Sequence, residues 1–195
     1  MLGVSATSRG VLPPNESNGR SLIPSANTIT YFICYPVSIK GEALNMVQVR
    51  RYLLGDEKAI SKLHLKLNDF FEEDYVSPQF IYESAHRPDF IFNVAEHAGE
   101  VTGFCGALFY ESVGRAQIGP IAVSNEYMRQ GIGGKLLRKT LNDLKEAGVF
   151  RVIARVKEKN QDTLVFFEKQ GFRREALLEK YTKKGENTVQ LLTFI

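Results

Sequence analysis

Three glycines at positions 131, 133 and 134 mark the stretch of this chain whose composition suggests chemistry. They follow an apolar stretch and open an amphipathic one, which predicts a strand, a tight bend and a helix in that order. Glycine adopts backbone angles closed to other residues and lets a ligand approach the main chain. Because the first N–H groups of the helix would point at the bend, we expect an anion site suited to phosphate or pyrophosphate. The alternative is a tight turn that binds no ligand.

The spacing of these glycines excludes two common phosphate-binding motifs. It lacks the third glycine of G-x-G-x-x-G, and no Gly-Lys-Ser/Thr closes a four-residue gap as in a P-loop. The three histidines are scattered without metal-ligand spacing, so we expect no metal. Cys34 and Cys105 do not form a disulfide framework, and Cys105 lies in an apolar run typical of a small buried hydrophobe.

The composition is typical of a soluble globular protein, with 195 residues of which 44% are hydrophobic and 24% charged. A net charge of +3 is too small to indicate a nucleic-acid partner, and no apolar stretch is long enough to indicate a membrane partner. The sparse cysteines favour a reduced, cytoplasmic protein. Residues 1–45, rich in Pro, Ser and Asn, are expected to be a disordered or loosely attached extension, and residues 46–195 to form the domain.

Hydrophobic periodicity predicts the elements that would position the glycine bend. Strands are expected over residues 47–52, 90–96, 101–110, 116–123, 149–156, 175–182 and 188–194. Helices are expected from Asp56 to about residue 71, from Ser77 to before Pro88, from the glycine bend to Gly148, and from Asn160 to Gly171, with Asp56 and Asn160 as caps. Pro120 removes a ladder donor, so its strand should be irregular there or lack a partner on one side. The order predicts an α/β (α+β) fold with a mixed central sheet of about seven strands flanked by about four helices.

Two segments of this pattern resemble the acetyl-CoA motifs of the GCN5-related N-acetyltransferases (GNAT). Residues 121–137 resemble the central motif, Arg/Gln-x-x-Gly-x-Gly/Ala, and residues 160–172 resemble the second motif, an Asn followed by a Tyr and then Gly-Phe. The resemblance covers roughly residues 46–195. It implies the acyl-CoA N-acyltransferase fold. It also implies an enzyme that transfers acetyl from acetyl-CoA to a primary amine of a small molecule or a protein, by direct attack.

The resemblance also implies which residues hold the cofactor. The end of the fourth strand would bond the pantetheine arm through its backbone, beside a splay between the fourth and fifth strands. The bend would cradle the pyrophosphate, mostly through main-chain N–H groups. Met128 replaces the first Arg or Gln of the motif, but Arg129 still offers a charge. The implied set is Ile121, Ala122, Val123, Arg129, Gln130, Gly131, Ile132, Gly133, Gly134, Asn160 and Phe167. For Asn160, a plain helix cap is the alternative.

The groups that handle protons in such enzymes are replaced in this chain. Phe167 stands where the family has a Tyr that protonates the thiolate, and Gln117 and Arg155 stand where relatives carry a Glu base. Tyr110 and Glu111 are either substitutes or strand-end surface residues, and we favour the second interpretation. A site without a strong base would select weakly basic amines or relay the proton through water. The catalytic residues and the acceptor are therefore not assigned.

The acidic run Asp69, Glu72, Glu73 and Asp74 lies in the region that shapes the acceptor pocket of this family. It would attract a cationic acceptor, or it is a solvated helix end. Two other functions stay open: an acyl-CoA-binding module or sensor with weak or lost catalysis, and a nucleotide-phosphate binder of another fold. The last hairpin also offers a surface through which a homodimer could form.

Overall fold

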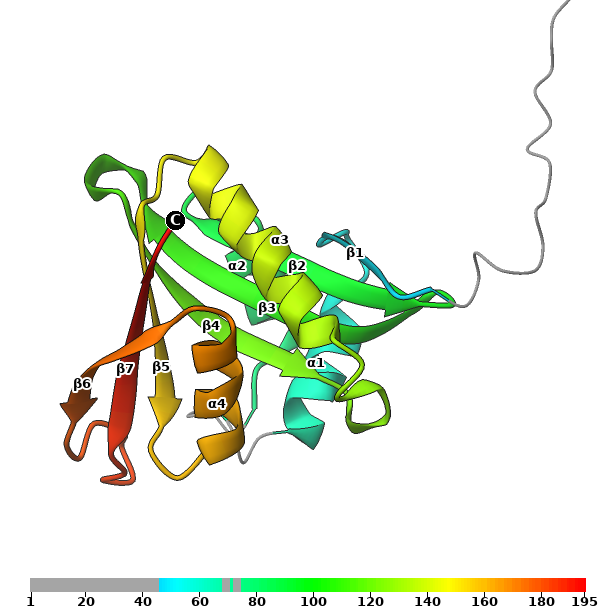
Figure 1. Cartoon of the computed structure of the whole chain (residues 1–195). Coiled ribbons are helices and arrows are strands. Elements are labelled where there is room, and N and C mark those ends of the chain that lie inside the picture. Colours follow the sequence, from blue (N-terminus) through cyan, green and yellow to red (C-terminus); the bar gives the residue numbers. More distant parts are fainter. Residues whose placement is uncertain (1–45, 68–70, 72–74) are drawn as a thin grey trace, which may run out of the picture. The chain divides into compact units, whose positions relative to one another are not determined.

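The computed structural model describes residues 46–67, 71 and 75–195 (Figure 1). The expected extension of residues 1–45, which includes Cys34, lies outside the described residues. The acidic residues Asp69, Glu72, Glu73 and Asp74 also lie outside them, so neither interpretation of that run is tested. None of the described helices has the length and apolarity needed to cross a lipid bilayer.

The described residues form one mixed sheet of seven strands with the element order expected from the sequence. The elements are β1 (Gln48–Arg51), α1 (Glu57–Lys66), α2 (Pro78–Ala85), β2 (Phe90–His97), β3 (Glu100–Tyr110), β4 (Arg115–Val123), α3 (Ile132–Glu146), β5 (Arg151–Lys157), α4 (Gln161–Lys169), β6 (Arg173–Leu178) and β7 (Thr188–Phe194). The spatial order is β1-β2-β3-β4-β5-β7-β6. All neighbours are antiparallel except β4 and β5, which are parallel.

The side chains of β2 alternate between two apolar layers, one on each face of the sheet. Ile91 and Ala95 face the layer that contains α3 and α4, whereas Phe92 and Val94 face the layer that contains α1 and α2. This follows from the period of two along a strand. In Figure 1, α3 and α4 accordingly lie over one face of the sheet and α1 over the other. The fold class expected from the sequence is confirmed.

A buried polar cluster ties α3 to the sheet. Asn93, fully buried on β2, donates from its side-chain amide to Thr140 Oγ1 at 3.0 Å and to Asp143 Oδ2 at 2.8 Å. Asp143 also forms ion pairs with Lys139 and, at 3.3 Å, with Arg51 of β1. Because buried polar groups need partners, this cluster specifies how α3 lies on β1 and β2.

Two expectations about the first helix are wrong. Asp56 occupies the N-cap position of α1, but its side chain does not cap the helix, because its carboxylate accepts from Arg50 at 2.7 and 3.0 Å and from the Leu53 N–H at 2.8 Å. The guanidinium therefore competes successfully for the oxygens that would have capped the helix. The helix also ends at Lys66, and Phe71 beyond it stacks on the His64 ring with the centroids 4.3 Å apart.

The sixth strand is shorter than the expected range of 175–182. It ends at Leu178, and the connection to β7 spans residues 179–187. Polar side chains hold this connection: the Lys180 N–H donates to Asn187 Oδ1, and the Glu186 N–H donates to Thr182 Oγ1, both at 3.0 Å. These side-chain contacts offer the backbone an alternative to the ladder.

Candidate active site

β4 separates from β5 midway along its length. The parallel ladder begins at Arg115 with Arg151 and ends at Ile118 with Ala154. Beyond that point, the described partners of β4 lie on β3 alone, with Ile121 opposite Cys105, and β5 continues along β7. Pro120 stands where the strands separate, and the β3–β4 register shifts at the same place. The irregularity expected at Pro120 is confirmed, and it leaves the facing edges of β4 and β5 open to a ligand.

The glycine bend forms the N-terminus of α3. Gly131 occupies the cap position with φ 79°, a left-handed conformation that glycine adopts without strain. Within the described residues, no side chain caps this helix, so the N–H groups of its first turn face the bend. Arg129, exposed beside it, also has a positive φ of 62°. The bend therefore presents partial positive charge, as expected for an anion site.

The other two glycines have packing reasons to be glycine. A Cβ at Gly133 would lie 3.3 Å from the Phe166 ring of α4. A Cβ at Gly134 would lie 3.2 Å from Arg138 Nη1 and 3.4 Å from Gln170 Oε1. Of the three glycines, Gly131 is thus the one whose backbone conformation makes the bend, while the others allow close packing of the helix.

Side-chain contacts anchor the loop that enters the bend. The Tyr127 hydroxyl lies 3.1 Å from His97 Nδ1 in the β2–β3 hairpin, and their rings are 5.3 Å apart. Gln130 donates from its side chain to the Glu126 carbonyl at 3.2 Å. The side chain of Gln130 is therefore engaged within the loop, which leaves its backbone to contribute to the bend.

Asn160 and Phe167 bring α4 to the separation between β4 and β5. Asn160 Oδ1 accepts from the Thr163 N–H at 3.3 Å, so the expected cap is confirmed. Phe167 is 2% exposed and packs edge-on against Phe166 and Phe172, so it is a core aromatic as well as a lining residue. Its ring supplies no proton where the family motif has a hydroxyl.

A cavity of about 870 Å³ lies between α1 and α2 on one side and β4, β5 and α4 on the other. Of the residues expected at the site, Ile121, Asn160, Phe167, Gln117 and Arg155 line it. The described lining contains no residue of the glycine bend, and the buried Ala122 packs against the layer that contains α1 and α2. The candidate site therefore has two parts, the glycine bend and a separate cavity.

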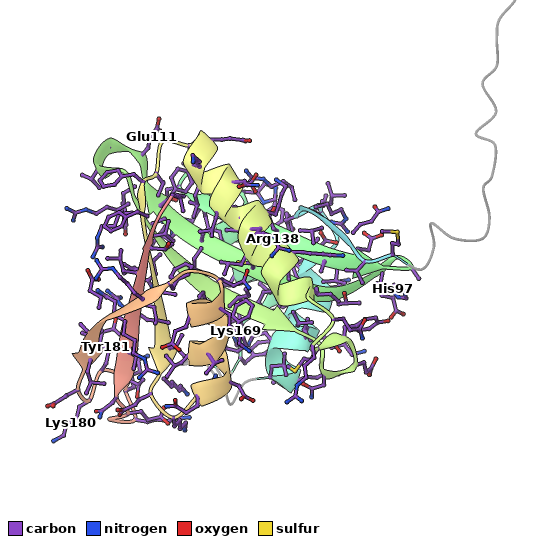
Figure 2. All side chains as sticks on the ribbon, viewed as in Figure 1. His97, Glu111, Arg138, Lys169, Lys180 and Tyr181 are labelled. Atoms are coloured by element: carbon purple, nitrogen blue, oxygen red, sulfur yellow. The ribbon has the colours of Figure 1, made fainter. Side chains whose placement is uncertain are left out.

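Tyr110 and Glu111 do not belong to this cavity. Tyr110 is 53% exposed, and neither residue is part of the described lining. Figure 2 shows Glu111 near the top of the view and Tyr181, which lines the cavity, well below it. The interpretation of both as strand-end surface residues fits their positions.

Tyr181 and His64 are among the lining residues that were not expected from the sequence. Tyr181, in the β6–β7 connection, accepts a hydrogen bond from Arg155 Nη1 at 2.7 Å, and its ring centroid lies 5.2 Å from the guanidinium carbon. His64, on α1, is 3% exposed and stacks on Phe71 at the cavity wall. The local sequence around these two residues does not predict their place. Tyr181 reaches the cavity from the β6–β7 connection and His64 from one face of α1, and only the folded chain brings these parts together.

Cys105 has no nucleophilic character in this environment. It is fully buried on β3, and burial raises the pKa of its thiol to about 12. At neutral pH it is therefore the thiol rather than the reactive thiolate. The expectation of a small buried hydrophobe is confirmed. Among the described residues, no group of three or more His, Cys, Asp or Glu side chains could hold a metal ion.

Comparisons with known proteins agree with this geometry. The model of the acetyltransferase (GNAT) family matches residues 59–172. A Bacillus subtilis (strain 168) protein, named as a ribosomal protein bS18-alanine N-acetyltransferase, is 27% identical over 120 residues, which cover 61% of this chain and 78% of that protein.

Two solved structures share the fold. Ard1 from Thermoplasma volcanium superposes with a TM-score of 0.68 at 22% identity, over 76% of this chain and 97% of that one. The yncA protein from Salmonella typhimurium, solved with its cofactor acetyl-CoA, gives 0.68 at 18% identity, over 77% and 94%. The motifs, the separated strands and the family match lead to one conclusion: this chain belongs to the acetyltransferase (GNAT) family.

Proposed function

We propose that this chain transfers acetyl from acetyl-CoA to a primary amine of a small molecule or a protein. The observation that carries the proposal is the separation of β4 from β5 after Ile118 and Ala154, together with the uncapped helix N-terminus at Gly131. An opened strand edge suits an extended arm rich in amides, and a helix N-terminus suits a pyrophosphate. The large cavity at the separation leaves room for an acceptor.

The cofactor would be held mainly by main-chain groups. The backbone of Ile121, Ala122 and Val123 would bond the pantetheine arm. Arg129, Gln130, Gly131, Ile132, Gly133 and Gly134 would form the pyrophosphate cradle, with Arg129 adding charge. Asn160 lines the cavity and would add a contact to the cofactor beside its capping bond. Acetyl-CoA, when bound there, supplies the activated acetyl group as donor substrate.

The residues at the usual proton-handling positions select the kind of amine. Gln117 and Arg155 line the cavity but are not bases at neutral pH, and Phe167 is not an acid. A lysine-like amine with a pKa of about 10.4 costs roughly 4–5 kcal/mol to deprotonate at pH 7, whereas an α-amine costs about 1 kcal/mol. We therefore propose an acceptor amine of low basicity, whose proton leaves through water. The Bacillus subtilis relative is named for an alanine acceptor, which agrees with an α-amine.

A ligand test and an activity test together decide this function. Acetyl-CoA at 100 times its dissociation constant should stabilise the fold by about 2.7 kcal/mol, or roughly 5–10 °C in melting temperature. CoA should act similarly and NAD should not. Release of CoA from acetyl-CoA in the presence of a panel of amines then reports transfer. No shift with either CoA compound would refute the cradle.

The second candidate is an acyl-CoA-binding module or sensor with weak or lost catalysis. The buried Phe167 favours it, because the position that protonates the thiolate in the family holds a ring built into the core. A shift with acetyl-CoA and no transfer to any amine would favour this candidate. Transfer to one acceptor at a rate above the uncatalysed reaction would exclude it.

Three further expectations concern the extent of the domain, its cellular compartment and its oligomeric state. We expect residues 46–195 to be the acetyltransferase domain, the reaction to take place in the cytoplasm, and a homodimer to form through the last hairpin. Expression of residues 46–195 alone and measurement of its mass in solution would test the first and third. Fluorescent tagging in cells would test the second.

A further inference from the structure

The charged side chains that the described residues place on the cavity wall all have one sign. Among the described residues that line the cavity, the side chains charged at neutral pH are Arg87, Arg155 and Lys157, and Asp and Glu do not occur. The three cations come from different elements: Arg87 follows α2, and the other two lie on β5. Taken alone, these three side chains disfavour a polycationic acceptor.

Two of these cations are already paired with carboxylates. Arg87 donates to both oxygens of Asp89, at 2.9 and 2.7 Å. Lys157 lies 3.2 Å from a carboxylate oxygen of Glu186. Their charges are therefore offset within the protein, and they offer less to a ligand.

Arg155 has only neutral partners in the described part of the chain. Its Nε donates to Gln190 Oε1 at 3.1 Å, its Nη1 donates to the Tyr181 hydroxyl at 2.7 Å, and its guanidinium lies over the Tyr181 ring. Both Arg155 and Tyr181 are exposed, and these contacts orient the planar group without neutralising it. Arg155 lies next to Ala154, where the β4–β5 ladder ends, so its charge is held where the two strands separate.

The pair formed by Arg155 and Tyr181 has hydrogen-bond donors to spare. Arginine has five N–H donors, and the bonds above use Nε and one of the two terminal nitrogens. The Tyr181 hydroxyl accepts from Arg155, so its own O–H is directed elsewhere. A fork of guanidinium and hydroxyl donors matches the two oxygens of a carboxylate.

Another part of the cavity lining is apolar and aromatic. Its rings come from α2, β2 and β3, and comprise Phe80, Phe90, Phe92 and Phe104. Three of them pack in sequence, with Phe92 5.8 Å from Phe90 and 5.9 Å from Phe104 between centroids. An acceptor that fills the cavity therefore meets both aromatic rings and an unneutralised guanidinium.

We infer that the acceptor amine belongs to a molecule that also carries a carboxylate and an apolar side chain, and that Arg155 with Tyr181 binds the carboxylate. This inference rests on the function proposed above and specifies its substrate class. The carboxylate has two sources, the α-carboxylate of a free amino acid or an acidic side chain near the N-terminus of a peptide. Arg155 is a specificity residue in this scheme, standing where a base would otherwise be expected.

Calorimetric titration of the protein–CoA complex tests this without requiring turnover. One arm compares the peptide amides Ala-Glu-Phe, Ala-Gln-Phe and Ala-Lys-Phe, and the other compares L-phenylalanine with L-phenylalaninamide. In the arm whose probes carry the kind of carboxylate that the site recognises, the carboxylate-bearing probe should bind about tenfold more tightly than its neutral counterpart. Arg155→Gln should abolish that preference, Arg155→Lys should keep part of it, and Tyr181→Phe should reduce it.

Arg173→Gln is the matched control, because it removes the same charge from the exposed strand β6, outside the cavity lining. It should leave the preference intact. Arg155→Glu should reverse the preference toward Ala-Lys-Phe amide. Equal binding within both arms of the wild type, tighter binding of the lysine peptide, or no binding of any probe at millimolar concentration would overturn the inference. Acetyl transfer is measured separately, so carboxylate preference without transfer would refute the proposed function alone.

Discussion

Gly131 and Gly148 stand at opposite ends of α3 with nearly the same left-handed backbone, φ 79° and 77°. A Cβ at either position would meet no atom within 4 Å, so both demand glycine for conformation and not for space. They differ in surroundings, because Gly131 forms the bend of the candidate site and Gly148 ends the helix far along the chain. This makes them a natural pair for separating backbone strain from ligand binding.

Gly131→Ala and Gly148→Ala should each lower the stability by about 1–2 kcal/mol, because the left-handed conformation is sterically unfavourable for alanine. Only Gly131→Ala should also weaken acetyl-CoA binding, by about tenfold, if relaxation of the bend turns one N–H donor away from the pyrophosphate. Urea unfolding measures the first effect and calorimetry the second. Equal loss of affinity in both variants would show that the bend has no special role.

Phe167→Tyr should restore a proton donor where the family motif has one. If protonation of the thiolate limits the rate, kcat should rise by about 10–100-fold. Stability should fall by about 1–3 kcal/mol, because the position is buried and the hydroxyl needs a partner. Phe172→Tyr is the control: this ring packs against Phe167 but does not line the cavity, so it should lose stability without gaining rate. An unchanged kcat in Phe167→Tyr would show that another step limits the reaction.

At the scale of elements, the sequence predicted those helix boundaries that depend on neighbouring residues in the chain. Hydrophobic periodicity, a start at Ser77, the cap at Asn160 and the ends at Gly148 and Gly171 located the helices after the first one correctly. Asp56 was misassigned because its partner, Arg50, lies on β1, and no local rule weighs a cap against an ion pair. The cavity wall contributed by Tyr181 could not be predicted, because its place depends on β7 pairing between β5 and β6.

At Asn160, capping of α4 has to be distinguished from binding of the cofactor. Asn160→Ala should cost about 1 kcal/mol, because the helix loses its cap. Asn160→Asp keeps an oxygen acceptor for the Thr163 N–H and should retain the stability of α4. Both variants should bind acetyl-CoA more weakly if the amide contacts the cofactor. If Asn160→Asp bound acetyl-CoA with wild-type affinity, Asn160 would act only as a helix cap.

At the scale of the whole molecule, several carboxylates that are at least partly exposed are stabilised by the fold in separate places. The pKa of Glu57 is lowered by its own backbone N–H and by Tyr52, and that of Asp89 by Arg87. The pKa of Glu175 is lowered by Gln190 and Arg151, and that of Glu186 by Lys159 and Lys157. Each group binds protons less readily when folded, so its contribution is present above its ordinary pKa and is lost as pH falls through the lowered one.

The melting temperature should therefore stay nearly level from pH 7 to about 5 and decline below about pH 4.5, where the unfolded carboxylates begin to take up protons. Added salt should make the decline shallower, because exposed pairs are screened. A series of thermal melts across pH at two salt concentrations measures both. A melting temperature that is constant down to pH 3 would contradict this account.

The place of β7 has a consequence for how the protein is made. β7 is the last strand along the chain, yet it lies between β5 and β6 and is the one described neighbour of β6. β5 and β6 leave the ribosome before β7, so the position between them in the sheet is still empty in the growing chain. Thr188 of the cavity wall and Gln190, the partner of Arg155, arrive with that strand. The acceptor side of the cavity therefore takes shape only after β7 has left the ribosome and paired between β5 and β6.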